Sequence, residues 1–189
     1  MKKISTLFTK DSNDLGRVID KINAENIWVI NGDAIATRKF DGTAVAIING
    51  ELFKRFDAKK GRAIPVDAIP CQDADLISGH HPHWLKCNRS KSEDKFFFEG
   101  FDNLETKTDG TYELCGPKVQ GNPENLERHT LIKHGSEVID FSSLAFDDLR
   151  EFLSENDIEG IVFHHISDGR MCKLRKSDFG IKRLKLEEV

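Results

Sequence analysis

Lys39 lies in a setting where a lysine side chain could act as a nucleophile. It belongs to the stretch TRKFDGTAVAIINGELFKR, between Arg38 and Phe40 and just before an Asp-Gly pair and an apolar run. A lysine beside a half-buried strand is usually a surface residue whose stem covers apolar neighbours. The same position suits an amine that approaches a bound substrate, so the residue alone leaves both interpretations open.

The chemistry of such an amine sets requirements on the rest of the chain. An amine attacks phosphorus only when it is deprotonated, and lowering a lysine pKa from about 10.4 to about 7.4 takes roughly 4 kcal/mol. Nearby cations or partial burial provide this destabilisation of the ammonium. Lys173 and Arg175 are two residues apart, so on a strand they point to the same face. We expect them to lower the pKa of Lys39 and to stabilise phosphate charge during transfer.

Two glutamates and a glycine complete the candidate set. Glu159 directly precedes the strand-like run GIVFHHI, where it can help to hold a divalent cation. Glu113 lies within YELCG, and Gly42 follows Asp41, where we expect a sharp bend. Each glutamate has an ordinary alternative interpretation: Glu159 can follow a helix end, and Glu113 can be an exposed strand residue.

Strands dominate the elements that must position these residues. Asn49-Gly50 between TAVAII and ELFKRF favours a type I′ hairpin, since both turn residues need positive φ. TYELCG reads as another strand, and GIVFHHI and RMCKLRK form a second hairpin around a Ser-Asp-Gly turn. The pattern predicts an α+β fold with largely antiparallel sheets and flanking helices.

Two helices and one long loop are predicted outside the strands. The spacing of Leu15, Val18, Ile19 and Ile22 predicts a short amphipathic helix. SSLAFDDLREFLSEN predicts a clearer helix, with Ser142 or Ser143 as its cap. The stretch 63–94 is rich in Pro, His and Asp and is expected to be loop-like.

Four short stretches resemble, in order and spacing, the motifs of the covalent nucleotidyltransferases, which are ATP-dependent DNA and RNA ligases and mRNA capping guanylyltransferases. They are KFDG at 39–42, YELCG at 112–116, EGIVF at 159–163 and KLR at 173–175. In that superfamily the lysine of K-x-D-G forms a lysyl-nucleotide phosphoramidate. The resemblance therefore implies that Lys39 is the nucleophile.

The resemblance also implies roles for the other residues. Glu113 matches a glutamate that approaches the nucleotide ribose, and Glu159 matches one that works with the metal and the lysine. Lys173 and Arg175 match residues that contact the α-phosphate. Arg55, sixteen residues after the lysine, fits an arginine placed near the ribose or the incoming phosphate. No aromatic residue that would stack on adenine is evident in HTLIKHGSEVID.

A narrower similarity points to RNA as the substrate. ATRKFDGTA, YELCGPKVQGNPE, SGHHPHW and KLRKSDFG are similar to single-domain RNA ligases related to the vertebrate RNA ligase 1 family. DNA ligases and capping enzymes normally append an OB-fold domain, whereas fourteen residues follow Arg175. We expect residues 1–189 to form a single nucleotidyltransferase (adenylation) domain without an OB-fold.

The implied activity is that of an ATP-dependent RNA ligase of the RNA repair type. ATP would serve as AMP donor with Mg²⁺ or Mn²⁺, and the chain would join 5′-phosphate and 3′-hydroxyl RNA ends through lysyl-AMP and an adenylylated RNA. Two alternatives remain. One is a nucleotidyltransferase on another acceptor, such as a guanylyltransferase, and the other is an inert relative that binds nucleotide or RNA.

Composition and charge set outer limits on the partners. The net charge is −4, yet five of the nine residues 54–62 and seven of the sixteen residues 170–185 are basic. This segregation suggests a basic groove on an acidic protein, although such charge runs are more commonly a solvated surface. No signal peptide is evident, and the longest apolar run, AVAII, is far below the about 20 residues of a membrane span. We expect a cytoplasmic protein with no membrane partner.

The cysteines and histidines give a weaker signal. Cys71, Cys87, Cys115 and Cys172 form no C-x-x-C pair, which favours reduced thiols. Residues 71–87 hold zinc-capable side chains, but their spacing matches no standard zinc pattern. A structural or RNA-contacting loop is the preferred interpretation of that stretch.

Overall fold

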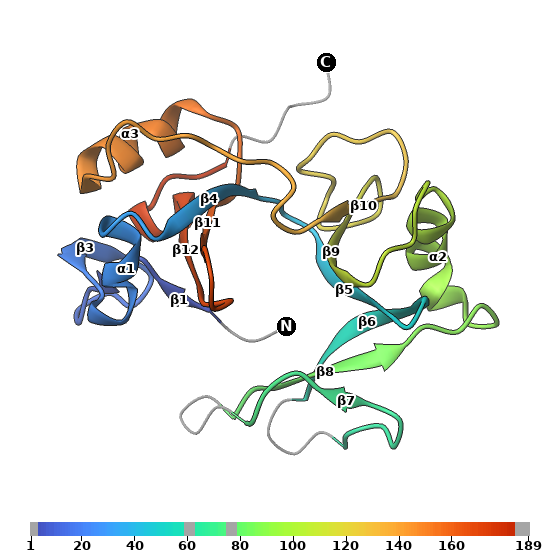
Figure 1. The fold of residues 1–189 in the computed structure, drawn as a ribbon. Helices are drawn as coiled ribbons and strands as arrows, with labels where there is room; N and C mark the ends of the chain where they lie inside the picture. The colour runs from blue at the N-terminus through green and yellow to red at the C-terminus, as the bar shows by residue number, and fades with distance from the viewer. Residues whose placement is uncertain (1–3, 59–62, 75–78, 184–189) are drawn as a thin grey trace. The chain divides into compact units, whose positions relative to one another are not determined.

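The structure is a computed structural model that describes residues 4–58, 63–74 and 79–183. The chain divides into two compact units, each of which is described by itself (Figure 1). One unit contains Asp41–His134, and the other combines Ile4–Phe40 with Gly135–Val189. The expectation that residues 1–189 form one domain stays a prediction.

The unit Asp41–His134 is built on a six-stranded antiparallel sheet. The strand order is β10-β9-β5-β6-β8-β7. The strands are β5 (Thr43–Ile48), β6 (Glu51–Ala58), β7 (Ile69–Pro70), β8 (His81–Lys86), β9 (Gly110–Cys115) and β10 (Thr130–Lys133). A short 3-10 turn, η2 (Ser92–Asp94), leads into helix α2 (Lys95–Asp102), which packs its Phe101 against Leu52, Tyr112 and Leu114 of the sheet.

The hairpin predicted around Asn49-Gly50 is confirmed. β5 and β6 pair antiparallel with Ile48 opposite Glu51. Asn49 and Gly50 adopt φ values of 52° and 74°, as a type I′ turn requires. The carboxylate of Asp109 accepts hydrogen bonds from both of their backbone N–H groups, at 2.7 and 3.0 Å, and these bonds fix the turn.

The other unit holds a four-stranded sheet with the order β1-β12-β11-β4. β11 pairs antiparallel with both neighbours, and β1 runs parallel to β12. The strands are β1 (Ser5–Thr6), β4 (Ala34–Lys39), β11 (Gly160–His165) and β12 (Met171–Arg175). A separate ribbon pairs β2 (Phe8–Lys10) with β3 (Val18–Ile22). The remaining elements are η1 (Ala24–Asn26), α1 (Ile27–Ile30), α3 (Phe146–Glu155) and η3 (Lys176–Phe179).

One face of this four-stranded sheet forms the apolar core of its unit. Ile161, Phe163 and Leu174 are at most 1% exposed and pack with Leu149 and Leu153 of α3. Because side chains alternate along a strand, the residues between them point to the opposite face. That second face is therefore available for polar side chains.

The helix predicted in SSLAFDDLREFLSEN is confirmed, but its start differs from the prediction. α3 begins at Phe146 with Ala145 at the N-cap position, and no side chain caps it there. Ser143 Oγ instead accepts the N–H of Ala145 at 3.2 Å, one step before the helix. Asp147 and Asp148 lie in the first turn, where negative charge is favourable.

The helix predicted from Leu15, Val18, Ile19 and Ile22 is wrong, because Val18–Ile22 is strand β3. Only Val18 is buried in this five-residue segment, so backbone pairing rather than a regular burial pattern identifies the strand. Val18 and Ile22 pair with β2, and β-branched side chains fit such a surface well.

The described part of the stretch 63–94 contains secondary structure that was not predicted. β8, with the sequence HPHWLK, pairs over its whole length with residues Phe53–Ala58 of β6. The strand was not predicted because its first three residues, His-Pro-His, are not typical of strands. Pro82 stays compatible with the sheet because its carbonyl accepts from Cys71, which needs no N–H from proline.

The predicted α+β class, with mostly antiparallel sheets and few helices, is confirmed. Among the described residues, no helix is long and apolar enough to span a bilayer.

Candidate active site

Three neighbouring strands bring the predicted lysine and arginine into one row. In the β4–β11–β12 pairing, Gly160 lies opposite Lys39 on one side and opposite Arg175 on the other. Residues directly opposite each other project to the same face, here the face away from the apolar core. Lys39 and Arg175 therefore flank a position that has no side chain.

Lys39 ends β4 and forms an ion pair with Glu159. Its Nζ donates to Oε2 of that carboxylate, and the two side chains are 24% and 22% exposed. Glu159 immediately precedes β11, so the β4–β11 register fixes the pair. The structure thus brings together the predicted nucleophile and the predicted metal-binding glutamate.

Gly160 is required by close packing. A Cβ at this position would lie 2.3 Å from the carbonyl oxygen of Leu174 and 2.8 Å from the Cα of Arg175. Any side chain here would push β12 away from β11. The glycine thereby keeps the row between Lys39 and Arg175 both aligned and open.

Lys173 lies one row further along the same face. It is opposite Val162 of β11, which in turn is opposite Thr37 of β4. Burial, reinforced by the charges of Arg175 and Lys39, lowers the pKa of Lys173 to about 8. No carboxylate forms an ion pair with its ammonium within the described part of the chain. An anion that reached Lys173 would meet a partly desolvated cation that no described carboxylate contacts in an ion pair.

Arg175 is held in place by Asp178. The Asp178 carboxylate is 0% exposed and accepts from the Arg175 backbone N–H at 2.8 Å, from Nε at 3.3 Å and from Nη2 at 3.0 Å. These hydrogen bonds raise the pKa of Arg175, which stays charged. The geometry orients the guanidinium from behind while a third of the side chain remains exposed.

Glu113 and Arg55 share one face of the six-stranded sheet in the other unit. Glu113 lies opposite Ala44, and Phe53 lies opposite Ala46. Ala44 and Ala46 share a face, as do Phe53 and Arg55, so Glu113 and Arg55 do too. The structure thus places the predicted residues in two sets, Lys39 with Glu159, Lys173 and Arg175, and Arg55 with Glu113.

His134 orients the carboxylate of Glu113. Its Nε2 lies 2.9 Å from Oε2 of Glu113, and its Nδ1 lies 2.9 Å from Oγ1 of Thr111. A carboxylate only accepts hydrogen bonds, so Nε2 carries a proton in this arrangement. Glu113 is 8% exposed, and this contact satisfies one of its oxygens.

The Asp41-Gly42 turn is fixed against β9. A Cβ on Gly42 would lie 2.2 Å from the carbonyl oxygen of Leu114, so glycine is needed for close approach. Gly42 does not adopt the positive φ that would require glycine in a sharp bend. The backbone N–H of Asp41 donates to Oε1 of Glu124 at 2.9 Å, which ties loop 116–129 to the turn.

Three of these residues were missed by the sequence analysis, and only one had a usable signal. Asp178 follows Arg175 by three residues, the spacing at which an acidic side chain can return to the start of a helical turn. His134 and Glu124 act on residues 21 and 83 positions away, so no local pattern identifies them.

The two basic stretches are less available than their charge suggests. Lys54 is 15% exposed and pairs with Asp94 at 2.5 Å and Glu93 at 2.8 Å. Arg170 pairs with Asp168 at 2.7 Å. Residues 59–62 and 184–189 lie outside the described residues, so the predicted basic groove stays a prediction.

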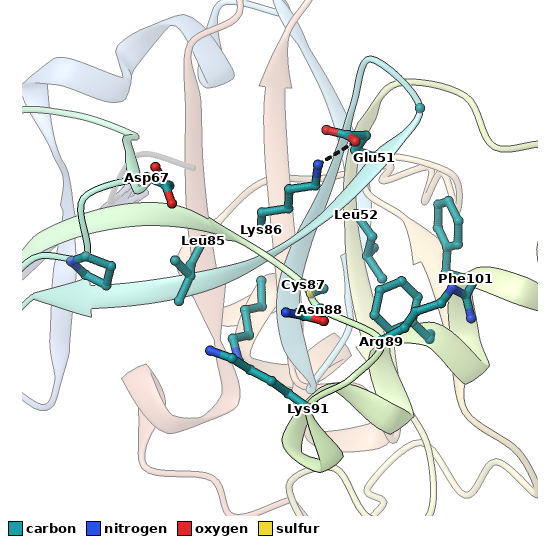
Figure 2. Close-up of a pocket in the computed structure, with 14 residues that line it drawn as sticks. Glu51, Leu52, Asp67, Leu85, Lys86, Cys87, Asn88, Arg89, Lys91 and Phe101 are labelled. Carbon is teal, nitrogen blue, oxygen red and sulfur yellow. Dashed lines mark hydrogen bonds and ion pairs between the residues drawn. The ribbon is translucent and has the colours of Figure 1, made fainter.

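A cavity of about 670 Å³ lies apart from the predicted residues, within the unit Asp41–His134 (Figure 2). Leu52, Leu85 and Cys87 line it on the α2 side of the sheet, the face opposite Arg55. Its cations are largely neutralised: Lys86 pairs with Glu51 at 2.5 Å, and Arg89 pairs with Asp102, which lies outside the lining. The cavity does not have the character of a phosphate site.

The donor set fits a divalent cation that arrives with a nucleotide. Mg²⁺ is commonly bound by one or two carboxylates together with substrate phosphates. Glu159 supplies one such carboxylate next to three cations. The described residues contain no group of three or more His, Cys, Asp or Glu side chains that could hold a metal. In the stretch 71–87, His80 instead pairs with Asp57 at 2.7 Å.

The α+β fold, with mostly antiparallel sheets and few helices, is consistent with a nucleotidyltransferase-type domain. A family model for RNA ligase 1 matches residues 71–188, more than half of the chain. The chain therefore belongs to the RNA ligase 1 family, which supports an RNA ligase activity. The match includes Glu113, Glu159, Lys173 and Arg175 and begins after Lys39 and Arg55. A comparison with curated proteins finds no match.

The lowered pKa of Lys173 predicts a stability cost. Below pH 8 the folded protein carries the ammonium in a desolvated position, whereas between about pH 8 and 10.5 only the unfolded chain stays protonated. The free energy of unfolding of the wild-type protein should therefore increase as pH rises through that window. We expect Lys173→Met to raise the free energy of unfolding at pH 7 by on the order of 1–2 kcal/mol, allowing for solvent screening, and to lose this advantage toward pH 10.

Urea unfolding at pH 7 and pH 10 measures the effect. Lys182→Met, at an exposed position of the same unit, is the matched control and should show little change at either pH. A Lys173→Met protein that is less stable than wild type at pH 7, or equally shifted at both pH values, contradicts the prediction.

Proposed function

We propose that this member of the RNA ligase 1 family is an ATP-dependent RNA ligase that acts through lysyl-AMP on Lys39. The observation that carries the proposal is the strand register that sets Lys39, Gly160 and Arg175 in one row, with Glu159 on the amine and Lys173 beside it. A nucleophile, a carboxylate and two phosphate-binding cations converge there.

In the first step the Nζ of Lys39 attacks the α-phosphorus of ATP. A P–N bond forms, the nitrogen releases one proton to solvent, the bond to the bridging oxygen breaks, and pyrophosphate leaves with the electron pair. Glu159 accepts a hydrogen bond from the amine and so orients it toward the phosphorus. A divalent cation bound with the nucleotide would supply charge neutralisation at the phosphates.

Lys173 and Arg175 stabilise the charge that develops on the phosphate oxygens. Lys173 forms no ion pair with a carboxylate among the described residues. A bound phosphate would be an anionic partner and would raise the pKa of Lys173 again. Arg175 is oriented by Asp178 before substrate arrives, so little reorganisation is needed.

The later steps move the AMP and then release it. A phosphate oxygen of the RNA 5′ end attacks the phosphorus of lysyl-AMP, which frees Lys39 and leaves AMP joined to the RNA through a pyrophosphate bond. The RNA 3′-hydroxyl then attacks the 5′-phosphorus, and AMP departs. Glu113 and Arg55 serve the nucleotide ribose and the incoming phosphate, with His134 orienting Glu113.

The covalent intermediate gives the first test. We expect incubation with ATP and Mg²⁺ to add the mass of one AMP to the protein, whereas GTP, CTP and UTP add nothing. Lys39→Ala should abolish the adduct, and the control Lys21→Ala, at an exposed position of β3, should retain it. The intact-protein mass spectrum measures all of these.

Each alternative has its own signature in that spectrum. A GMP adduct formed from GTP alone indicates a guanylyltransferase, and no adduct with any nucleotide indicates an inert relative. Both results contradict the proposal, as does an adduct that persists in Lys39→Ala.

The acceptor sugar gives the second test. The 2′-hydroxyl lets a protein distinguish RNA from DNA at a reacting end, and phosphate contacts make binding weaken with added salt. We expect 5′-phosphate RNA to be joined to an RNA 3′-hydroxyl at least about tenfold faster than to a matched strand with deoxyribose terminal nucleotides. This difference corresponds to about 1.4 kcal/mol.

Sealing rates on the paired substrates at two salt concentrations measure the preference. Equal or faster joining of the deoxyribose strand contradicts RNA selectivity while leaving the covalent chemistry standing.

A further inference from the structure

A fully buried carboxylate joins Lys10 to the candidate phosphate site. Oδ1 of Asp178 accepts from Nζ of Lys10 at 2.6 Å and from Nη2 of Arg175 at 3.0 Å. Because both nitrogens contact the same oxygen atom, the two cationic groups are close neighbours. Lys10 comes from β2, 168 residues away in the sequence.

Aromatic packing holds β2 next to η3, so this contact is built into the fold. Phe8 of β2 meets Phe146 with ring centroids 4.9 Å apart, and Phe146 meets Phe179 at 5.0 Å. Phe179 directly follows Asp178, and Phe8 precedes Lys10 by two residues. The apolar cluster thereby fixes the positions from which both charged side chains extend.

The charges of this network are unequal. Two cations face one carboxylate, and Arg175 alone already gives Asp178 three hydrogen bonds. Burial acts to raise the pKa of Asp178, but hydrogen bonds from Arg175 and Lys10 hold it below its usual value, so the carboxylate stays ionised. These three side chains therefore carry one net positive charge that is uncompensated among themselves.

The uncompensated charge is exposed. The Asp178 side chain is 0% exposed, whereas those of Lys10 and Arg175 are 29% and 33% exposed. The part of the network that solvent or a ligand can contact is therefore cationic. Arg175 projects from the face that also carries Lys39 and Lys173, so this cationic surface continues the candidate phosphate site.

We propose that Lys10 is a further phosphate-binding residue, held by Asp178 beside Arg175 to contact a substrate phosphate other than the α-phosphate. The inference rests on the proposed ligase function. The ligand is a phosphate oxyanion, and the reaction offers two sources of it: the pyrophosphate that leaves ATP and the 5′-phosphate of the RNA.

The test uses a variant that removes the charge and keeps a hydrogen bond. Lys10→Gln can still donate to Asp178, and Lys10→Arg keeps the charge. Lys21→Gln is the matched control, since Lys21 is an exposed lysine on the same two-stranded ribbon. Melting temperatures of all variants report whether the fold is retained.

Two reactions of the preformed lysyl-AMP protein separate the two sources. The first is reversal by added pyrophosphate, which reforms ATP, and the second is transfer of AMP to 5′-phosphate RNA. We expect Lys10→Gln to raise the KM for one of these phosphates at least about tenfold, as the loss of a charge-assisted contact would. Lys10→Arg should stay within about threefold of wild type, and Lys21→Gln should match wild type in both. The substrate whose KM rises identifies the phosphate that Lys10 binds.

A folded Lys10→Gln protein with both KM values within about twofold of wild type overturns the proposal and makes the network purely structural. If Lys10→Gln does not fold, a Lys10→Arg protein that folds but loses both reactions overturns it as well, while one that keeps them supports it. A wild-type protein that forms no lysyl-AMP contradicts the proposed function itself, so the two failures are distinguishable.

Discussion

The antiparallel pairing of β11 with β4 and β12 is the constraint on which the candidate site depends. This register alone places Lys39, Gly160 and Arg175 in one row and Lys173 in the next. A slip of one residue would turn each of these side chains into the apolar core. The buried Ile161, Phe163 and Leu174 on the other face therefore fix the site as firmly as its own contacts do.

Electrostatic repulsion is the cost of this arrangement. Lys39, Lys173 and Arg175 share one face. Burial and the charges of the other two cations lower the pKa of Lys173, which reflects the repulsion between these groups. Glu159 and Asp178 offset part of it by pairing with Lys39 and Arg175. Together with Lys10, four cations face two carboxylates. Under the proposed function, a phosphate-bearing substrate would supply negative charge here, so its binding would relieve a repulsion that folding creates.

Much of the fold was predictable from short-range signals. The Asn49-Gly50 hairpin, the β11–β12 hairpin and α3 each carry their signal within about a dozen residues. The segment Val18–Ile22 was mistaken for a helix because its apolar spacing follows the helical period, and pairing with β2 makes it a strand instead. β8 was missed because its pairing partner β6, rather than its own composition, makes it a strand.

The residues of the candidate site likewise divide into those that a local motif predicts and those that only a distant contact reveals. Local motifs marked Lys39, Glu113, Glu159, Lys173 and Arg175, and the register explains why four of them meet. Lys10, Glu124 and His134 were not predicted, because each acts through a contact with a residue distant in sequence. The lowered pKa of Lys173, of which burial is the largest cause, was not predicted from the sequence.

This last point makes one measurement the most direct test of the central claim. Two lysines share the face, and the lowered pKa of Lys173 makes it a competing candidate for the nucleophile. The account selects Lys39 because Glu159 orients its amine, and it keeps Lys173 as a phosphate contact. Peptide mapping by tandem mass spectrometry, after incubation with ATP and Mg²⁺, locates the AMP. The account predicts AMP on the peptide containing Lys39 and none on Lys173, and AMP on Lys173 would contradict it.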